Sequence, residues 1–143
     1  MRSLIYITLA VTLAACSKEE PITEVPHIEF VSVSPAQAQA FEDNIIFTIF
    51  YQDGDGDLGE NNPDVKNLFL KDNRNAIVYE YRVEQLAPDD ANISIQGELN
   101  IELSGTGITD GSQQQSATFD IYLVDRAGNK SNTITTSSIT ISS

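Results

Sequence analysis

Residues 44–60 are NIIFTIFYQDGDGDLGE, and this stretch decides the fold. Apolar and polar residues alternate in its first half, with Ile45, Phe47, Ile49 and Tyr51 on one side of the chain. A period of two is typical of a half-buried β-strand, because successive side chains of a strand point to opposite faces. The second half is acidic and rich in glycine, which ends the strand and predicts a tight turn.

Further segments with the same alternation lie on both sides of this strand. Val31 shifts the parity of the first of them, which predicts a β-bulge. Gly97 interrupts the longest one with a position that has no side chain, and such a position suits a bend or a switch between sheets. No segment shows the spacing of an amphipathic helix. We therefore expect strands at residues 28–34, 68–70, 77–83, 93–103, 119–123 and 134–141, a polar turn at residues 72–75 and a loop at residues 104–116.

The number and spacing of these segments predict one domain at residues 27–143, an all-β sandwich of seven or eight strands. Residues 119–132 (FDIYLVDRAGNKSN) resemble the penultimate strand and hairpin of bacterial immunoglobulin-like and fibronectin-type-III-like domains. The resemblance implies an immunoglobulin-like antiparallel β-sandwich, without the cysteine pair and core tryptophan of antibody domains. An eight-stranded jelly roll is the alternative architecture.

The acidic stretch at residues 53–64 (DGDGDLGENNPD) carries the one motif with recognisable chemistry. Aspartates at alternate positions converge their carboxylates, the glycines allow a tight backbone curl, and such hard oxygen ligands suit Ca²⁺. The order of the candidate ligands along the chain follows that of an EF-hand loop, with two departures. Leu58 stands where the turn glycine is expected, and the last ligand is an aspartate in place of a glutamate. The predicted ligands are Asp53, Asp55, Asp57, the carbonyl of Gly59 and Asp64.

A solvated acidic turn is the alternative for this loop, since Asp-Gly pairs are common in turns. Three carboxylates within five residues repel one another unless a cation lies among them, and this favours the metal site. Mg²⁺ fits less well, because a loop that offers many oxygens suits a larger and more flexible coordination shell. In an immunoglobulin-like fold the hairpin at residues 125–132 and the N-terminus of the domain lie at the same end, so Asp125 is a further expected ligand.

The N-terminal residues predict that the protein is exported and carries a lipid. Arg2 and the uncharged apolar residues 4–13 form a signal peptide, since the apolar run is shorter than the roughly 20 residues of a membrane-spanning helix. Residues 13–16 (LAAC) resemble the lipobox of bacterial lipoproteins. The resemblance implies cleavage after residue 15 and a diacylglycerol on the thiol of Cys16, the chain's one cysteine. An ordinary secretory signal with a chance cysteine is the alternative. Residues 16–26 are expected to form the lipidated start and a flexible stalk.

Residues 17–20 (SKEE) place an acidic pair close behind Cys16. This resembles the surface-export signal of Bacteroidetes-type lipoproteins, a group that also includes proteins with a DGDGD loop in an immunoglobulin-like domain. The resemblance implies an outer-membrane lipoprotein that is held by its acyl chains and displayed on the cell surface. A protein that faces the periplasm is the alternative.

Composition disfavours several classes of function. The net charge of −13 repels nucleic acid and anionic lipid headgroups, so we expect neither as a partner. His27 is the one histidine, tryptophan is absent, and no nucleophile–base pattern or phosphate-binding glycine loop is present. We therefore expect no enzyme. A two-carboxylate glycosidase is the catalytic alternative, but the aspartates cluster in one loop instead of facing each other across a cleft.

Some apolar side chains are expected to point away from the core on neighbouring strands. Exposed apolar clusters of this kind often mark a partner site. The alternative is that the N-terminal segment or the loop at residues 104–116 covers them. The expected function is that of a calcium-stabilised binding or adhesion module for a protein, with a glycan-binding accessory subunit of an outer-membrane polysaccharide uptake system as the alternative. The residues of this partner patch are Phe69, Val78, Tyr122 and Val124.

Overall fold

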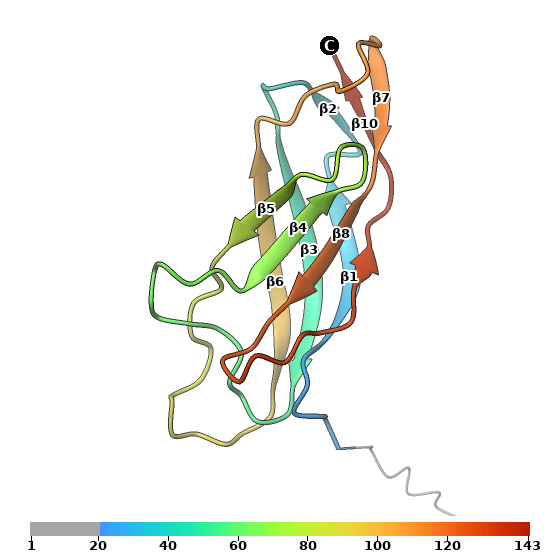
Figure 1. The fold of residues 1–143 in the computed structure, drawn as a ribbon. Helices are drawn as coiled ribbons and strands as arrows, with labels where there is room; N and C mark the ends of the chain where they lie inside the picture. The colour runs from blue at the N-terminus through green and yellow to red at the C-terminus, as the bar shows by residue number, and fades with distance from the viewer. Residues whose placement is uncertain (1–20) are drawn as a thin grey trace, which may run out of the picture.

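The computed structural model describes residues 21–143, which contain ten β-strands and no helix (Figure 1). The predicted signal peptide and Cys16 lie outside the described residues. No helix of the described part has the length and apolar character needed to cross a membrane. In chain order the strands are β1 (His27–Ser34), β2 (Gln37–Gln39), β3 (Asn44–Asp53), β4 (Leu68–Asp72), β5 (Val78–Tyr81), β6 (Ile95–Ser104), β7 (Gln114–Ala117), β8 (Phe119–Leu123), β9 (Ile134–Thr135) and β10 (Ile139–Ser142).

Two sheets form the two layers of the sandwich (Figure 1). One has the strand order β1-β3-β6 and the other the order β5-β4-β8-β9, and all pairs within them are antiparallel. A third and shorter sheet, β2-β10-β7, lies at the end that carries the C-terminus. Its β2–β10 pair is parallel, which departs from the all-antiparallel expectation.

Interrupted strands explain why ten are observed where the sequence predicts seven or eight. β1 and β2 are separated by the cis Ser34–Pro35 bond, β7 and β8 by Thr118 alone, and β9 and β10 by residues 136–138. With each pair counted once, the first, second and fifth strands share one sheet, and the third, fourth, sixth and seventh share the other. The first, second and fifth strands thus face the third, sixth and seventh, as in the immunoglobulin-like fold, while the fourth strand, β5, joins the second sheet and not the first. The all-β class and the predicted sandwich are therefore confirmed.

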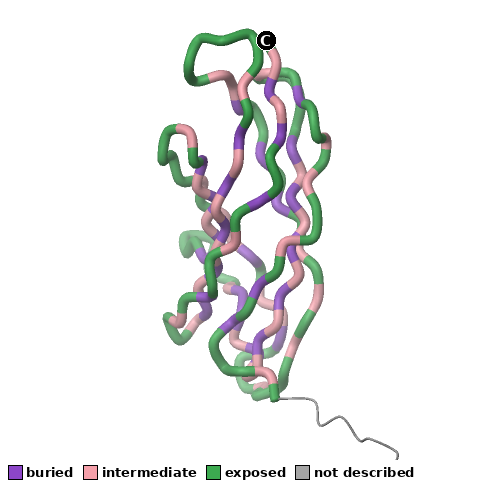
Figure 2. Tube along the Cα trace, turned by 90° about the vertical axis from the view of Figure 1, so that its right-hand side faces the viewer, coloured by how far each residue is buried: buried purple, intermediate pink, exposed green. Residues whose placement is uncertain are grey.

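The hydrophobic core lies between the two layers, where buried residues line the inner sides of the strands (Figure 2). Ile45 and Ile49 are fully buried, and Tyr51 is nearly so. The rings of Phe47 and Phe119 connect the two sheets at a centroid distance of 5.0 Å and an angle of 64°. This is the edge-to-face geometry that aromatic pairs prefer. The alternation predicted for residues 44–53 is confirmed, and β3 has the same bounds.

Two local predictions have different outcomes. The register between β1 and β3 shifts between Phe30 and Ser32, so the predicted bulge is confirmed. The predicted bend at Gly97 is wrong, because β6 pairs with β3 without interruption and Gly97 lies opposite Tyr51. A Cβ at Gly97 would lie 3.0 Å from the hydroxyl oxygen of Tyr51. The glycine therefore makes room for the tyrosine side chain and does not redirect the strand.

The strands place the acidic loop and the hairpin after β8 at one end of the sandwich. β3 and β8 belong to facing sheets and both run towards this end, where the N-terminal segment also enters the domain (Figure 1). The carbonyl of Thr23 accepts a hydrogen bond from the N–H of Gly54 at 2.8 Å. Pro26 is buried. The last residues of the segment predicted as a stalk thus lie against the acidic loop.

Candidate metal centre

Three aspartates from two loops converge at this end of the sandwich. Asp53 is the last residue of β3, Asp57 lies four residues further along the acidic loop, and Asp125 follows β8. One carboxylate oxygen of each lies within 4.8 Å of the other two. Asp53 is fully buried and Asp125 is 6% exposed, while Asp57 is half-buried. The fold therefore holds three carboxylates in a small volume that is largely shielded from water.

The acidic loop is shaped by its own backbone contacts. The N–H of Leu58 donates to Oδ2 of Asp53 at 2.9 Å, and the Leu58 side chain is fully buried in the core. Gly56 has a φ of 77°, and a Cβ there would collide with the carbonyl oxygen of Ile93. A residue with a side chain would be strained in this conformation. The chain therefore curls between its two fixed ends, Asp53 and Leu58.

The hairpin after β8 is bound to this loop through backbone groups. The N–H of Ala127 donates to Oδ2 of Asp57 at 3.0 Å, and the N–H of Arg126 donates to the Asp57 carbonyl at 3.3 Å. Asp125 accepts hydrogen bonds from the N–H of Asn129 at 2.7 Å and from its Nδ2 at 2.9 Å. A carboxylate offers about four lone-pair sites, so these bonds leave Asp125 able to bind a cation.

Three carboxylate oxygens of the loop are buried without any hydrogen-bond partner. They are Oδ1 of Asp53, of Asp55 and of Asp57. Buried polar atoms in folded proteins are almost always hydrogen-bonded, and an unpaired buried charge is costly. The nearby Arg126 does not supply the missing partner, because its Nη1 donates to the Gly59 carbonyl at 2.9 Å. An ion bound between Asp53 and Asp57 would supply the partner that their buried oxygens lack.

The electrostatics of the cluster also favour a positive charge. Burial, together with the charges of Asp55, Asp57 and Asp125, raises the pKa of Asp53 to about 6, against the lowering effect of the hydrogen bond from Leu58. Burial and the Asp125 carboxylate raise the pKa of Asp57 as well. Without a cation, protonation is the other way to relieve this repulsion.

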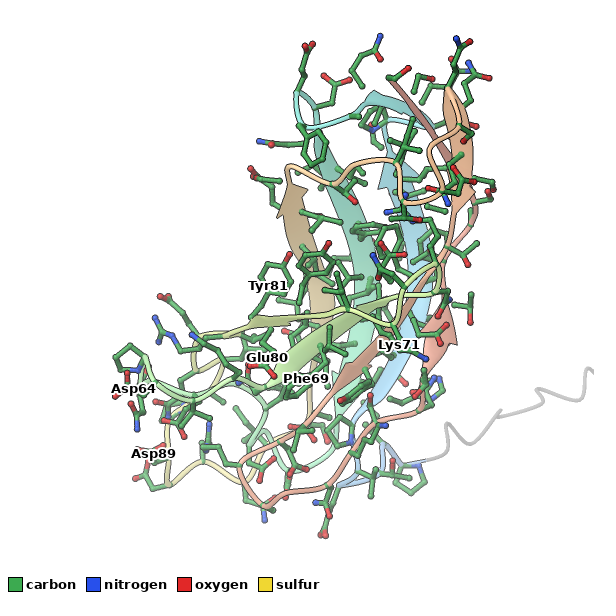
Figure 3. All side chains as sticks on the ribbon, turned by 45° about the horizontal axis from the view of Figure 1, so that its top comes forward. Asp64, Phe69, Lys71, Glu80, Tyr81 and Asp89 are labelled. Atoms are coloured by element: carbon green, nitrogen blue, oxygen red, sulfur yellow. The ribbon has the colours of Figure 1, made fainter. Side chains whose placement is uncertain are left out.

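The structure separates the predicted ligands into two groups. Asp53, Asp57 and Asp125 come together, whereas Asp55 has a buried oxygen without a hydrogen-bond partner but is not part of this cluster. The carbonyl of Gly59 is bonded to Arg126. Asp64 is exposed and is not part of the cluster; it lies at the outer edge of the loop (Figure 3). The site is thus built from both sheets instead of from one continuous loop.

Two contributions to the site were missed from the sequence. Leu58 anchors the loop in the core, and Asn129 fixes the carboxylate of Asp125 with two hydrogen bonds. An apolar residue at the position where a calcium loop needs glycine was the available signal that the loop follows its own path. For Asn129 the signal was its spacing from Asp125, which is typical of a side chain that closes a turn.

The predicted partner patch lies on the outer face of the second sheet. Phe69 of β4 pairs in register with Tyr122 of β8, and their rings stack with centroids 4.8 Å apart and planes 14° apart. Nζ of Lys130 lies 3.7 Å from the centroid of the Tyr122 ring. Val78 is 42% exposed, and Val124 is half-buried and forms a bridge with Lys130. Three of the four predicted residues are therefore on neighbouring strands, and Val124 directly follows β8.

Both segments that were considered as a cover of this patch form hydrogen bonds to other parts of the domain. Thr23 of the N-terminal segment is bonded to Gly54 in the acidic loop. The loop after β6 is bonded through the Gly107 carbonyl to Nη1 of Arg74 at 2.8 Å.

Comparison with protein-family models, with curated proteins and with solved structures finds no match to this chain.

Proposed function

We propose that this chain is a lipid-anchored, surface-exposed lipoprotein whose sandwich is stabilised by Ca²⁺ and which acts by binding a protein partner. The observation that carries the proposal is the set of buried and unpartnered oxygens of Asp53, Asp55 and Asp57 beside Asp125. These oxygens come from two loops that extend from facing sheets. An ion held there would join the two layers at the end of the domain that faces the membrane anchor.

The donor set supports Ca²⁺ as the ion. All candidate ligands are carboxylate oxygens, which are hard donors, and neither histidine nor cysteine belongs to the cluster formed by the described residues. Ca²⁺ takes six to eight oxygens in flexible geometry, whereas Mg²⁺ needs a near-octahedral shell and keeps several waters. Asp53, Asp57 and Asp125 would hold the ion from three directions. Asp55 would add a fourth carboxylate.

A thermal melt tests the calcium site. The full chain is melted in EDTA, and then with Ca²⁺ or Mg²⁺ added up to about 10 mM, because extracellular calcium modules bind with Kd of about 10⁻⁴–10⁻³ M. At ten times Kd one ion stabilises the protein by about 1.4 kcal/mol. For a domain of this size that raises the Tm by roughly 5 °C. A Ca²⁺-selective rise supports the site, and an unchanged Tm across the titration contradicts it.

The lipid anchor is supported by the lipobox and by the position of the N-terminal segment. Metabolic labelling with an alkyne-tagged fatty acid tests the anchor directly. We expect label on the wild-type chain and none on Cys16→Ser. Protease added to intact cells then tests display. Digestion of the wild-type chain supports the cell surface, and digestion only after lysis places the protein on the periplasmic side.

The geometry of the partner patch favours a protein over a glycan. Phe69 and Tyr122 cover one face of each other's ring, and Lys130 covers the second face of Tyr122. A sugar ring stacks on an open aromatic face, and both faces of the Tyr122 ring are already occupied, which leaves one face of Phe69 at most. Specific binding on a glycan array would contradict this preference and support the polysaccharide-uptake alternative.

A further inference from the structure

An apolar cleft of about 360 Å³ lies where the edges of the two sheets come together. One wall is formed by consecutive residues of β6, from Leu99 to Glu102, and the other by the end of β5 and the residues that follow it, from Tyr81 to Glu84. Leu68 and Leu86 complete the lining. Four consecutive residues line each wall, so the cleft follows both chain segments.

The β6 edge of the first sheet is open. β6 pairs with β3 on one side in an unbroken register of ten residue pairs. Within residues 21–143, no hydrogen bond outside this ladder involves the backbone of β6. Every second residue of β6 therefore directs its N–H and C=O away from β3. An exposed and regular edge of this kind is a template for another strand.

The opposite edge of the same sheet, formed by β1, is protected against pairing with a further strand, and this contrasts with the unprotected β6 edge. β1 carries the bulge between Phe30 and Ser32. The side chain of Asn132 bonds both backbone groups of Ile28, with its Oδ1 2.8 Å from the N–H nitrogen and its Nδ2 2.8 Å from the carbonyl oxygen. Bulges and covering groups are common protections of edge strands. β6 has neither, although it is longer than β1.

The second wall directs backbone groups toward the cleft as well. The N–H and carbonyl of Val83 are bonded to the side chain of Asn67 on the β4 side. Successive residues of an extended chain direct their backbone groups to opposite sides. The backbone N–H and carbonyl of Arg82 therefore face the cleft, and within the described residues these two backbone groups form no hydrogen bond.

The charged side chains at the rim of the cleft favour one kind of extended peptide. The side chain of Glu84 is 79% exposed, and Glu102 is exposed beside the open edge. The guanidinium of Arg82 is already bonded to Glu84 and to the carbonyls of Glu60 and Asn61. Glu102 forms no ion pair with the described residues. Two acidic residues and one basic residue line the cleft, so its rim carries a net negative charge that complements a basic segment.

We propose that this cleft binds an extended, basic peptide segment of a partner protein, which adds to β6 as a further strand. The segment places apolar side chains against Leu68 and Leu86 and Lys or Arg side chains beside Glu84 and Glu102. Main-chain hydrogen bonds supply affinity and alternate side chains supply specificity, as in other cases of strand addition. About four residues of β6 line the cleft, so about 13 Å of extended peptide is recognised. The proposal is independent of the metal centre and of the aromatic patch.

A second copy of the chain is a poorer occupant than a basic peptide. Two copies of β6 paired antiparallel about Asn100 would place Glu98 of one copy directly opposite Glu102 of the other. Pairing about either glutamate would place that residue opposite its own copy. Like charges directly opposite on neighbouring strands are destabilising. The net charge of −13 adds a general repulsion between copies.

A random library of linear peptides, displayed on phage and panned against the full chain, tests this proposal. We expect the enriched sequences to alternate apolar residues with Lys or Arg. A synthetic peptide of the best sequence should slow hydrogen exchange of the β6 amides near Asn100. N-methylation of every second peptide residue should abolish binding in one parity, because only one edge of the added strand pairs with β6.

Charge reversal provides the matched control. Glu84→Lys combined with Glu102→Lys should weaken the peptide about tenfold or more, which corresponds to about 1.4 kcal/mol. Glu29→Lys makes the same kind of change on the closed edge of the same sheet and should leave the affinity unchanged. Lack of any enriched sequence would overturn the proposal. Peptides that slow hydrogen exchange in β4 and β8 instead of β6 would also overturn it. The same holds for peptides that still bind when N-methylated in either parity.

Discussion

The N–H of Gly54 lies 2.8 Å from the carbonyl oxygen of Thr23 and donates a hydrogen bond to it. Gly54 stands between Asp53 and Asp55, so the segment that enters the domain is bonded to the loop that would hold the ion. A Cβ on Gly54 would overlap the carbonyl oxygens of Ile22 and Thr23. The absence of a side chain at this position therefore keeps the N-terminal segment against the acidic loop.

Replacing Gly54 by alanine should detach the N-terminal segment. We expect faster hydrogen exchange for residues 22–26 in Gly54→Ala, since the new methyl group displaces both carbonyls. Gly128→Ala is the control, because Gly128 has a φ of 87° and open space around it. It should cost about 1 kcal/mol in backbone strain. Unchanged exchange of residues 22–26 in Gly54→Ala would show that the contact does not hold the segment.

The metal proposal distinguishes Asp125 from Asp64. In Asp125→Asn the Ca²⁺-dependent rise in Tm should be lost, because one of the three converging carboxylates is removed. Asp64→Asn makes the same chemical change at an exposed residue outside the cluster and should keep the full rise. The opposite pattern would mean that the acidic loop binds the ion in EF-hand order, without the hairpin after β8.

Strand prediction succeeded where one face of a strand is buried. The alternation from Ile45 to Tyr51 is enough to define β3, because the core fixes which side chains point inward. It fails for β2 and β7, whose residues are mostly polar. These short strands are held by backbone pairing with β10, and backbone pairing leaves no hydrophobic pattern in the sequence.

The candidate site was predicted in part, for a related reason. Asp125 was found because an immunoglobulin-like topology places two distant loops at one end of the sandwich. Asp64 was included because an EF-hand loop was assumed to continue for twelve positions. The burial of Leu58 ends that loop early by anchoring it in the core. Local spacing thus identifies carboxylates, and only the tertiary fold decides which of them meet.

The raised pKa of Asp53 predicts a pH dependence in the metal-free protein. Its folded value of about 6 lies above the usual 3.8, so the folded state binds the proton more tightly than the unfolded state. The contribution of this group to stability is therefore lost as the pH rises from about 4 through about 6, by up to about 3 kcal/mol. In EDTA, Asp53→Asn should gain stability relative to the wild type over this range, measured by urea unfolding at each pH.

With saturating Ca²⁺, the loss of stability that the metal-free protein shows as the pH rises should be reversed. A bound ion favours the ionised carboxylates, so the stabilisation by Ca²⁺ should grow as the pH rises through about 6 and protons cease to compete. Asp53→Asn should gain no such pH-dependent stabilisation. A difference between wild type and variant that stays constant with pH would show that Asp53 is ionised at ordinary pKa in the folded protein.

A buried ion pair far from the metal centre gives a further stability prediction. Nη2 of Arg74 lies 2.7 Å from Oδ2 of Asp72, and both side chains are almost completely buried. The sequence indicates only a polar turn here, because composition cannot show that the turn folds inward. Arg74→Met should lose about 3–5 kcal/mol, since Asp72 stays buried without a partner. Arg82→Met, which removes the exposed pair with Glu84, should lose about 1 kcal/mol or less.

The double variant with Asp72→Asn identifies the cause of that loss. Arg74→Met combined with Asp72→Asn removes the charge that would otherwise stay unpaired, so part of the lost stability should return. Chemical unfolding of the single and double variants measures both values. If the double variant is as unstable as the sum of the single changes, the two side chains contribute independently and the pair itself is not the source of stability.

The stacked aromatic rings of the partner patch should contribute less to stability than the core does. In Phe69→Ser with Tyr122→Ser, the stack and the contact with Lys130 are both lost. Aromatic pairs are worth about 0.5–1.5 kcal/mol beyond their buried area. An exposed cation–π contact adds about 0.5–1 kcal/mol. We therefore expect a folded variant that loses about 2 kcal/mol in urea unfolding.

Phe119→Ala is the comparison for this double variant. Phe119 is fully buried against Phe47, and truncation of such a side chain costs about 3–5 kcal/mol. If the double variant loses as much as Phe119→Ala, the patch is part of the core and cannot be the partner surface of the proposed function. A folded variant with the smaller loss leaves the aromatic face free to bind, because its rings are then held by one another and by Lys130 rather than by the interior.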